Sequence, residues 1–395
     1  MTQSPLRLGV VGAGRFATFL TSAVADLPEV TVTVVTDTDP EAAAMLAKAY
    51  DARTVATWHD LVVAEEVDVV VIATPPTSHA EVTLAALDAG RHVFCEKPLA
   101  TSSADLDAIE EAVARSGRVL AVDHVLRHNP LLAAIARLQA EVLGPPRRFL
   151  FENDASDEDL DDAHWFWERA HSGGIFVEHG VHFFDAAQML LGRPATAVQA
   201  TAAHRPAGQV DLVSATVQHG PDVLATHTHS FTHAHRCERQ LMRLDHGCAE
   251  TRVEGWIPVQ AVVDAWTDDA GADELERLAS SSGLFALNGF RPVPGTAAAA
   301  VVHRDAGEPH ARGRGLDLTV PHHVRVTLTL GGHDAKAAVY AESVRAAVAD
   351  LARAVRTGAA PRCGVAEAVA ASRLALASTE AADLGRTVDL SGDLS

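Results

Sequence analysis

The sequence has only four cysteines, and they are scattered: Cys95, Cys237, Cys248 and Cys363 form no C-x-x-C pair. This spacing disfavours a disulfide scaffold and a cysteine-based zinc site, and it favours free thiols in a reducing cytosol. No apolar run is long enough to cross a bilayer, and the N-terminus lacks the basic region of a signal peptide. We therefore expect a cytoplasmic protein.

Basic residues are few beside acidic ones. The chain of 395 residues has 32 Lys and Arg against 52 Asp and Glu, a formal net charge of −20. This balance disfavours nucleic acid and anionic membranes as partners and suits a small-molecule ligand. No internal repeat or low-complexity tail supports a scaffold role. The length and a hydrophobic content of 48% predict a two-domain enzyme instead.

A glycine-rich turn follows the first expected strand, Leu6 to Val11. The residues from Gly12 to Ala17 form G-x-G-x-x-A between this strand and a helix. Gly12 permits a tight turn, Gly14 lets a pyrophosphate approach the backbone, and Ala17 lets the helix pack closely on the strand. The helix N-terminus offers unpaired N–H groups to phosphates. The motif in this setting predicts a dinucleotide site.

Asp37 follows the second expected strand, Val30 to Thr36. A carboxylate at this strand end accepts hydrogen bonds from the ribose hydroxyls of NAD and repels the 2′-phosphate of NADP. Its alternative role is to cap the helix that begins near Pro40. The glycine motif favours the cofactor role, and therefore NAD over NADP. A shift of the ribose toward Thr36 or Thr38 would still admit NADP.

Short apolar strands and helices alternate as far as residue 122, which predicts a doubly wound parallel sheet. Further strands are expected over residues 67–73, 91–95 and 118–122, and helices over 41–50, 58–65, 81–89 and 103–116. Ligands bind at the carboxyl edge of such sheets, where Thr74, Pro75 and Lys97 would lie. Because Pro98 restricts the backbone at Lys97, this residue is either a fixed cation that polarises a substrate oxygen or a solvated residue of a turn.

The residues beyond about 126 predict a second, α+β domain with a large, open and mainly antiparallel sheet. Strands are expected over residues 147–152, 196–201, 212–218, 223–231, 239–244, 248–253 and 324–330, and helices over 131–143, 340–357 and 365–383. Residues 268–321 are rich in Gly, Pro, Ala and Ser, with one helix expected over 273–278. We interpret this long segment as an insertion: a lid, an oligomerisation arm or a partly disordered loop. The expected domains are residues 1–125 and 126–395.

Four histidines of the second domain recur at even spacing: His227, His229, His233 and His235. They would share one face of a strand if the strand runs that far. H-x-H is also a metal-ligand spacing, but no acidic or cysteine pattern accompanies it. We interpret these residues as a sheet face, at a subunit interface or a pocket floor, and we expect no metal site.

A second informative stretch covers residues 164–185, where two glycines precede a helix expected over 174–191. Glu178 and His182 are four residues apart and Asp185 follows three residues later, so the three would share one face. A carboxylate beside an imidazole fixes its tautomer and raises its basicity, which makes His182 a candidate general base. The alternative is a structural ion pair beside a partly buried histidine.

Several of these motifs resemble the glucose–fructose oxidoreductase, inositol dehydrogenase and rhizopine-catabolism (Gfo/Idh/MocA) family. They are the run from Gly12 to Ala17, Thr-Pro-Pro-Thr-Ser-His over residues 74–79, and Gly-Arg-His-Val-Phe-Cys-Glu-Lys-Pro over residues 90–98. Residues 173–185 are similar to the family's Gly-Gly-x-x-x-Asp-x-Gly-x-His-x-x-Asp signature, with Glu178 at the position of the first Asp. The likeness is strong to about residue 191 and loose afterwards.

The resemblance implies roles for individual residues. Lys97 would lie beside the nicotinamide and the substrate hydroxyl, a cis peptide would precede Pro98, and His182 would be the catalytic base. Glu178 would orient His182 or bind an adjacent hydroxyl, and is the third expected catalytic residue. The expected cofactor contacts are Gly12, Gly14, Arg15, Phe16, Asp37, Thr74, Pro75, His79, Glu96 and Lys97. The expected substrate contacts are Arg127, Trp165, Trp167, Glu178 and Asp185, with Trp165 and Trp167 either stacked on a sugar ring or part of the core.

Together these observations predict an NAD(P)-dependent dehydrogenase that transfers a hydride between nicotinamide and a hydroxyl carbon of a sugar, glycoside or polyol such as inositol. Lys97 would stabilise the developing alkoxide. One alternative is redox-neutral glycoside cleavage with tightly bound NAD, and another is a non-catalytic sensor, which the presence of Lys97 and His182 disfavours. The resemblance also suggests a homo-oligomer, a dimer or a tetramer.

Overall fold

The structure is a computed structural model that describes residues 4–206, 208–292, 297–313 and 316–394. Its first sheet is parallel. Its six strands follow the order β3-β2-β1-β4-β5-β6. They are β1 Leu6–Val11, β2 Val30–Thr36, β3 Arg53–Thr54, β4 Val69–Ile72, β5 His92–Cys95 and β6 Leu120–Val122. All pairs of neighbours are parallel.

Buried β-branched residues explain why these strands form. Every residue of β4 is buried, as are the last three of β5, which is the pattern of a parallel strand covered on both faces. The strand order reverses between β1 and β4, and ligands of such sheets bind outside the carboxyl ends at that point. The residues that follow β1, β2, β4, β5 and β6 therefore meet at one edge.

Five helices alternate with these strands: α1 Arg15–Ala23, α2 Pro40–Ala49, α3 Trp58–Val63, α4 His79–Asp88 and α5 Ser103–Ser116. Polar caps fix where several of them begin. The Asp39 carboxylate accepts the N–H of Glu41 at the start of α2, and the Ser102 hydroxyl caps α5 in the same way. The alternative role of Asp37 as the cap near Pro40 is therefore wrong, because Asp39 fills that position.

The second sheet has ten strands in the order β14-β17-β13-β12-β11-β7-β10-β9-β8-β18. They are β7 Arg148–Asp154, β8 Ala197–His204, β9 Val210–Gln218, β10 Leu224–Ser230, β11 Arg239–Asp245, β12 Ala249–Glu254, β13 Gln260–Thr267, β14 Ala298–Ala306, β17 His322–Leu330 and β18 Val388–Asp389. β7 and β10 pair in parallel, and the other neighbours are antiparallel. Alternate residues of β9 are buried, as in a sheet with one covered face. The predicted fold class is confirmed.

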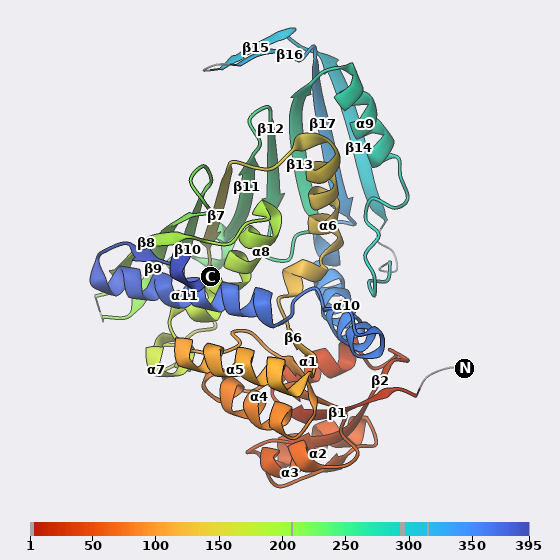
Figure 1. The fold of residues 1–395 in the computed structure, drawn as a ribbon, viewed down its shortest axis with the longest axis vertical. Coiled ribbons are helices and arrows are strands. Elements are labelled where there is room, and N and C mark those ends of the chain that lie inside the picture. Colours follow the sequence, from red (N-terminus) through yellow and green to blue (C-terminus); the bar gives the residue numbers. More distant parts are fainter. Residues whose placement is uncertain (1–3, 207, 293–296, 314–315, 395) are drawn as a thin grey trace. The chain divides into compact units, whose positions relative to one another are not determined.

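Much of the segment 268–321 belongs to this second sheet and its covering layer. It contains α9 Asp269–Ala279, the edge strand β14, and a hairpin of β15 His310–Gly313 and β16 Leu316–Thr319 (Figure 1). α9 contacts β13, β14 and β17. The sequence did not predict β14, because its first three residues are alanines, which give no alternation of large apolar and polar side chains. Parts of the predicted insertion, residues 293–296 and 314–315, lie outside the described residues.

Five further α-helices and several shorter helical turns lie among the described residues. The α-helices are α6 Pro130–Leu138, α7 Arg169–Ser172, α8 Val181–Leu191, α10 Lys336–Thr357 and α11 Val365–Leu384. π-helical turns cover Gln139–Leu143 and Phe176–Gly180, and 3₁₀ turns cover Pro76–Ser78, Val125–His128, Trp165–Trp167, His235–Cys237, His333–Ala335 and Ser391–Leu394. None of the helices in the described ranges is long and apolar enough to span a membrane.

The chain divides into two units. The first unit comprises Met1–His128, Asp162–Asp185 and Ala341–Thr379, and contains the parallel sheet. The second unit comprises Asn129–Asp161, Ala186–Tyr340 and Glu380–Ser395, and contains the ten-stranded sheet. The domain boundary near residue 125 stays a prediction. All the predicted catalytic and cofactor residues belong to the first unit.

Candidate active site

The glycine turn between β1 and α1 leaves room for a ligand against bare backbone. Gly12 has a φ of 97°, and a Cβ there would lie 2.5 Å from the carbonyl oxygen of Ala73. A Cβ on Gly14 would meet nothing within 4 Å, so the space beside it is open. Gly14 also begins α1 without a side-chain cap, which leaves the first N–H groups of the helix available to an anion. This arrangement fits a pyrophosphate.

Asp37 is held against the same turn. One carboxylate oxygen accepts the backbone N–H of Ala13 at 2.6 Å, and the other accepts that of Asp39 at 2.8 Å. These bonds aim the carboxylate at the mouth of the glycine turn, where it fits the hydroxyls of a ribose. Arg15 and Phe16, also expected at the cofactor, begin α1, where Arg15 is exposed and Phe16 is partly buried.

His79 does not face the cofactor edge as expected, because its side chain is only 1% exposed. Its ring nitrogens lie 2.7 Å from the carbonyl oxygen of Pro98 and 2.8 Å from that of Thr74. Burial lowers the pKa of His79. His79 therefore connects the loop after β4 to the loop after β5. It positions Thr74 and its neighbours and is not itself a cofactor contact.

Lys97 is fixed at the carboxyl end of β5. Its ammonium donates to the Glu178 carboxylate at 2.6 Å and to the backbone oxygen of Glu178 at 2.9 Å. An ammonium has three N–H donors, and among the described residues only these two bonds engage it. The Lys97–Pro98 peptide is cis, as the resemblance implies.

The Lys97–Glu178 pair keeps both groups charged. Burial opposes the charge of Lys97, but Glu178 and Glu96 outweigh burial and raise the pKa of Lys97. Burial likewise opposes the charge of Glu178, but Lys97 outweighs it and lowers the pKa of Glu178. An ammonium is therefore retained at the sheet edge with one N–H left for a ligand oxygen.

Asp123 joins this group although no sequence motif indicated it. It directly follows β6 and is 2% exposed. Burial raises its pKa to about 6, and burial and Asp123 together raise the pKa of Glu96 well above its ordinary value. Two carboxyl groups so close and so buried hold one proton between them more readily than two charges. One feature of the sequence could have indicated a role for Asp123. It directly follows an expected strand, and so lies at the same carboxyl edge of the sheet as Lys97.

His182 lies in the first turn of α8, just after a π-helical turn over Phe176–Gly180. Its ring is partly exposed, and its Nδ1 is buried with no hydrogen-bond partner among the described residues. The expected carboxylate partner is wrong: Glu178 binds Lys97. Glu178 lies within the π turn, and its carboxylate accepts a hydrogen bond from the Lys97 ammonium at the end of β5 instead.

The neighbours of His182 keep its ring neutral. Burial is the main cause that lowers its pKa, and Lys97, His124 and His179 add to it. The rings of His124 and His182 meet edge to face with centroids 5.9 Å apart. A neutral imidazole beside an ammonium can accept a proton from a hydroxyl that the ammonium polarises.

Arg127 and Asp185 bind each other. Burial of Asp185 corrects its expected contact with substrate, whereas the contact expected of Arg127 stays a prediction. The Arg127 Nε donates to both Asp185 oxygens, at 2.8 and 2.9 Å. The Asp185 side chain is fully buried, and that of Arg127 is 14% exposed. The pair ties the segment after β6 to α8 and so acts on the site through His182, one turn before Asp185.

The two tryptophans flank a buried phenylalanine in a 3₁₀ turn. Trp165 is 39% exposed, while Phe166 is 6% exposed. Trp167 is partly buried, and its ring meets that of Phe166 edge to face with centroids 4.9 Å apart. Trp167 thus packs partly into the first unit, whereas the exposed face of Trp165 is free to stack on a ligand.

Two family models match the chain. Residues 6–124 match the oxidoreductase family with an NAD-binding Rossmann fold, and residues 131–246 match the GFO/IDH/MocA C-terminal domain. The chain belongs to the Gfo/Idh/MocA family.

Named relatives of this Gfo/Idh/MocA chain act on sugars and inositols. It is 31% identical over 221 residues to inositol 2-dehydrogenase of Rhizobium meliloti (strain 1021), covering 54% of this chain and 65% of that protein. It is 31% identical over 214 residues to D-glucoside 3-dehydrogenase of Escherichia coli (strain K12), covering 49% and 56%. The chain therefore spans less than two thirds of the length of these relatives.

A solved structure shares the fold of this Gfo/Idh/MocA chain. Levoglucosan dehydrogenase in complex with NADH and L-sorbose superposes with a TM-score of 0.75 over 98% of this chain and 99% of that chain. The two sequences are 18% identical. A likeness at this identity establishes the fold alone.

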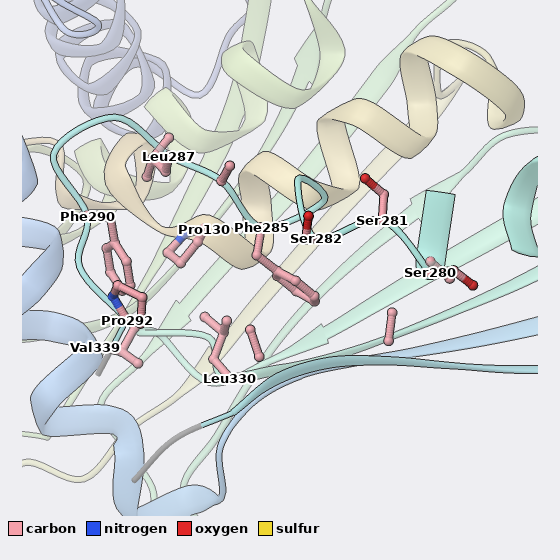
Figure 2. A pocket seen from close by; sticks show the side chains of 14 residues that line it. Pro130, Ser280, Ser281, Ser282, Phe285, Leu287, Phe290, Pro292, Leu330 and Val339 are labelled. Carbon is pink, nitrogen blue, oxygen red and sulfur yellow. The ribbon is translucent and has the colours of Figure 1, made fainter. Parts of the chain in front are cut away.

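A pocket in the second unit of this Gfo/Idh/MocA chain has a different character. It has a volume of about 560 Å³, and its walls include Phe285, Leu287, Phe290, Leu330 and Val339 (Figure 2). The polar side chains among the described lining residues are three serines, and none of these residues is charged. Without an acid or a base, this pocket does not supply the chemistry that surrounds Lys97.

The evenly spaced histidines also lie in the second unit. His227 and His229 are fully buried on one face of β10, with parallel rings. β10 ends at Ser230, so His233 and His235 do not continue that face. The condition for a face shared by all four, a strand that runs as far as His235, is therefore not met for the last two.

Proposed function

We propose that this chain is an NAD-dependent dehydrogenase that oxidises a hydroxyl carbon of a sugar, glycoside or polyol. The observation that carries the proposal is the Lys97 ammonium, held by Glu178 with one N–H donor left over, beside the neutral ring of His182. A fixed cation and a neutral base together suit the removal of a hydroxyl proton. The sugar and inositol dehydrogenases among the relatives support this substrate class.

The proton and the charge have separate acceptors in this scheme. Lys97 donates to the substrate oxygen and stabilises the negative charge that grows as its proton leaves. His182 accepts that proton and becomes an imidazolium. Bound NAD would supply the acceptor for the hydride that leaves the carbon bearing the hydroxyl. Glu178 acts through Lys97, because it holds the ammonium in place and keeps it charged.

The residues that would hold NAD form one edge of the parallel sheet. Gly12, Gly14 and the start of α1 suit the pyrophosphate, and Asp37 suits the adenosine ribose. Thr74 and Pro75 follow β4 and are expected on the nicotinamide side. We infer NAD rather than NADP, because a 2′-phosphate would meet the Asp37 carboxylate.

The test is the appearance of reduced nicotinamide absorbance when purified full-length protein meets NAD or NADP with inositols, aldoses, glycosides and sugar alcohols. We expect turnover with one substrate class, reduced about 10²- to 10⁴-fold in Lys97→Ala and in His182→Ala. The exposed residues Lys48 and His59 provide matched controls, Lys48→Ala and His59→Ala, which should retain turnover.

Two results would contradict the proposal. One is turnover that neither Lys97→Ala nor His182→Ala reduces, which would place the chemistry elsewhere. The other is a silent panel with a protein that neither binds added NAD nor releases a nucleotide on denaturation. Bound NAD released from an otherwise silent protein would instead redirect the substrate search to redox-neutral glycoside cleavage.

A further inference from the structure

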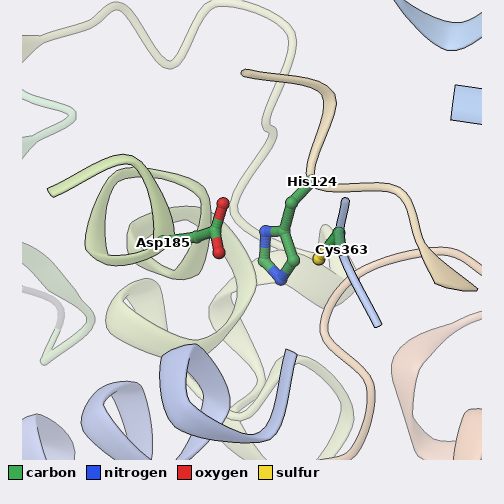
Figure 3. A group of neighbouring side chains, drawn as sticks. All are labelled: His124, Asp185 and Cys363. Atoms are coloured by element: carbon green, nitrogen blue, oxygen red, sulfur yellow. The ribbon is translucent and has the colours of Figure 1, made fainter. Parts of the chain in front are cut away.

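Three buried side chains from distant parts of the sequence converge in the first unit. His124 follows β6, Asp185 lies in α8, and Cys363 precedes α11 (Figure 3). A ring nitrogen, a carboxylate oxygen and the Sγ of these residues all lie within 4.8 Å of one another. His124 and Asp185 are fully buried, and Cys363 is 1% exposed. The cluster is separate from the residues assigned above to the proton, the hydride or the nucleotide.

The His124 ring makes the cluster unusual. Neither of its ring nitrogens has a hydrogen-bond partner among the described residues, although both are buried. Buried polar atoms are nearly always satisfied, so an exception calls for a partner of another kind. A metal ion is one that a neutral imidazole nitrogen binds well.

The ion pair between Asp185 and Arg127 is compatible with a metal ligand. The Arg127 Nε donates to both oxygens, but a carboxylate has about four lone-pair sites. Carboxylates that bind metals are usually held by an outer hydrogen-bond donor, which orients them. Arg127 would be that donor here.

We propose that His124, Asp185 and Cys363 bind one zinc ion. Thiolate, imidazole and carboxylate are each established zinc ligands, and the thiolate disfavours magnesium and calcium. A zinc ion at about 2.0–2.3 Å from each atom would draw the three side chains slightly inward. Three protein ligands leave a fourth position for water. The ion would hold the His124 ring against His182. The zinc site can be tested independently of the proposed dehydrogenase activity.

Elemental analysis and cobalt substitution test this site in full-length protein. The purified chain, stripped with a chelator and dialysed against zinc, should hold one zinc per chain. Cobalt in its place should give the near-ultraviolet absorption of a thiolate–cobalt bond. X-ray absorption on the zinc-loaded natural protein should show one sulfur at about 2.3 Å with nitrogen or oxygen ligands at about 2.0–2.2 Å, and this measurement needs no variant.

Variants assign the metal to these residues. Cys363→Ser should abolish the thiolate band, and both Cys363→Ser and His124→Phe should weaken zinc binding by more than about 100-fold, since loss of an outer partner alone costs 10- to 100-fold. Cys95→Ser is the matched control, because Cys95 is fully buried in β5. Cys237→Ser controls for an exposed thiol. Both controls should keep the stoichiometry and the band.

Clear results would overturn the proposal. Zinc and cobalt that fail to bind at micromolar concentration exclude the site. So does a zinc shell without sulfur, or binding that Cys363→Ser and His124→Phe leave unchanged. Binding lost equally in Cys95→Ser would place the metal on another thiol. Because these readouts are metal content and spectra, they do not depend on finding a substrate.

Discussion

Each unit of the molecule contains a pair of neighbouring histidines, and the pairs differ in their neighbours. In the first unit His124 and His182 meet edge to face, beside Lys97. In the second unit the rings of His227 and His229 lie parallel, 6.4 Å apart, and pack on phenylalanine rings of β7 at 5.4 and 5.3 Å. The Lys97 ammonium acts on the first pair, whereas the second pair packs on phenylalanine rings.

The comparison shows which part of a pKa shift points to function. Burial is the main cause that lowers the pKa in both units, for His182 as for His227. Burial lowers the pKa of any histidine in a core, so a shift caused by burial does not by itself indicate a functional site. For His182 the Lys97 ammonium adds to it, and a charged partner at a sheet edge is what distinguishes a candidate site.

The largest expected effect separates the two pairs by activity. His182→Ala removes the candidate base and should lower kcat about 10²- to 10⁴-fold. His227→Ala removes a ring that packs on Phe149 and should leave kcat nearly unchanged, while it lowers the free energy of unfolding by about 2–4 kcal/mol. Steady-state kinetics and urea unfolding of both variants make the comparison. Equal losses of kcat in the two would show that the neighbours do not mark the site.

A second effect depends on the charge of Lys97. In the natural chain Glu178 helps to raise the pKa of Lys97 against burial. In Glu178→Gln that support is gone, so the pKa of Lys97 falls and the ammonium is lost as pH rises through the lower value. Above that value kcat/KM should fall about tenfold per pH unit.

The measurement for Glu178 is kcat/KM from pH 6 to 10. Glu178→Asp keeps the charge on a shorter side chain and should restore most of the alkaline activity. An alkaline limb that Glu178→Gln does not move would mean that Glu178 merely packs against Lys97. Exposed Glu41→Gln, at the start of α2, is the matched control and should leave the profile unchanged.

The sequence predicted the parallel sheet well because its signals are local. The first two strands end where the glycine motif and Asp37 require. The motifs around Lys97 and His182 predict the two central residues of the candidate site, and their roles stay a prediction. The carboxylate partners were harder. The spacing of Glu178 and His182 is local, whereas the bond from Lys97 to Glu178 joins residues 81 positions apart, which no local pattern records.

Other site residues depend on contacts between distant parts of the chain. Asp123 and Glu96 share their environment only because β5 and β6 are neighbours in the sheet. His79 was named at the cofactor because it belongs to a motif, and only packing shows it to be buried between two loops. The proximity of Cys363 to His124 likewise could not be predicted from the sequence, because the two residues are far apart along the chain.

A third, smaller effect concerns acid stability in the second unit. Burial lowers the pKa of His227 to about 3, against an unfolded value of about 6.5. Between these values the unfolded chain binds a proton that the folded chain does not, so stability falls as pH falls, by about 1.4 kcal/mol per pH unit for one such group.

The test for His227 is urea unfolding of His227→Leu and of the natural chain between pH 7 and 4. The variant should lose less stability over this range, with kcat at pH 7 unchanged. The exposed residue His59 provides a control, His59→Leu, which should follow the natural slope. Parallel slopes for all three proteins would show that His227 is already charged in the fold.

The smallest expected effect concerns Asp37 in the first unit, the residue that we propose favours NAD over NADP. Asp37→Ser removes the charge that would repel a 2′-phosphate and the acceptor that the Ala13 N–H uses at 2.6 Å. The ratio of kcat/KM for NAD over NADP should fall about tenfold, the equivalent of one charge-assisted hydrogen bond. Asp39→Ser is the matched control, because Asp39 is an exposed carboxylate two residues away that caps α2, and Ser is itself a good cap. A ratio that moves equally in both variants would assign the preference to the net charge of the loop, whereas a change confined to Asp37→Ser assigns it to the carboxylate that the glycine turn holds in place.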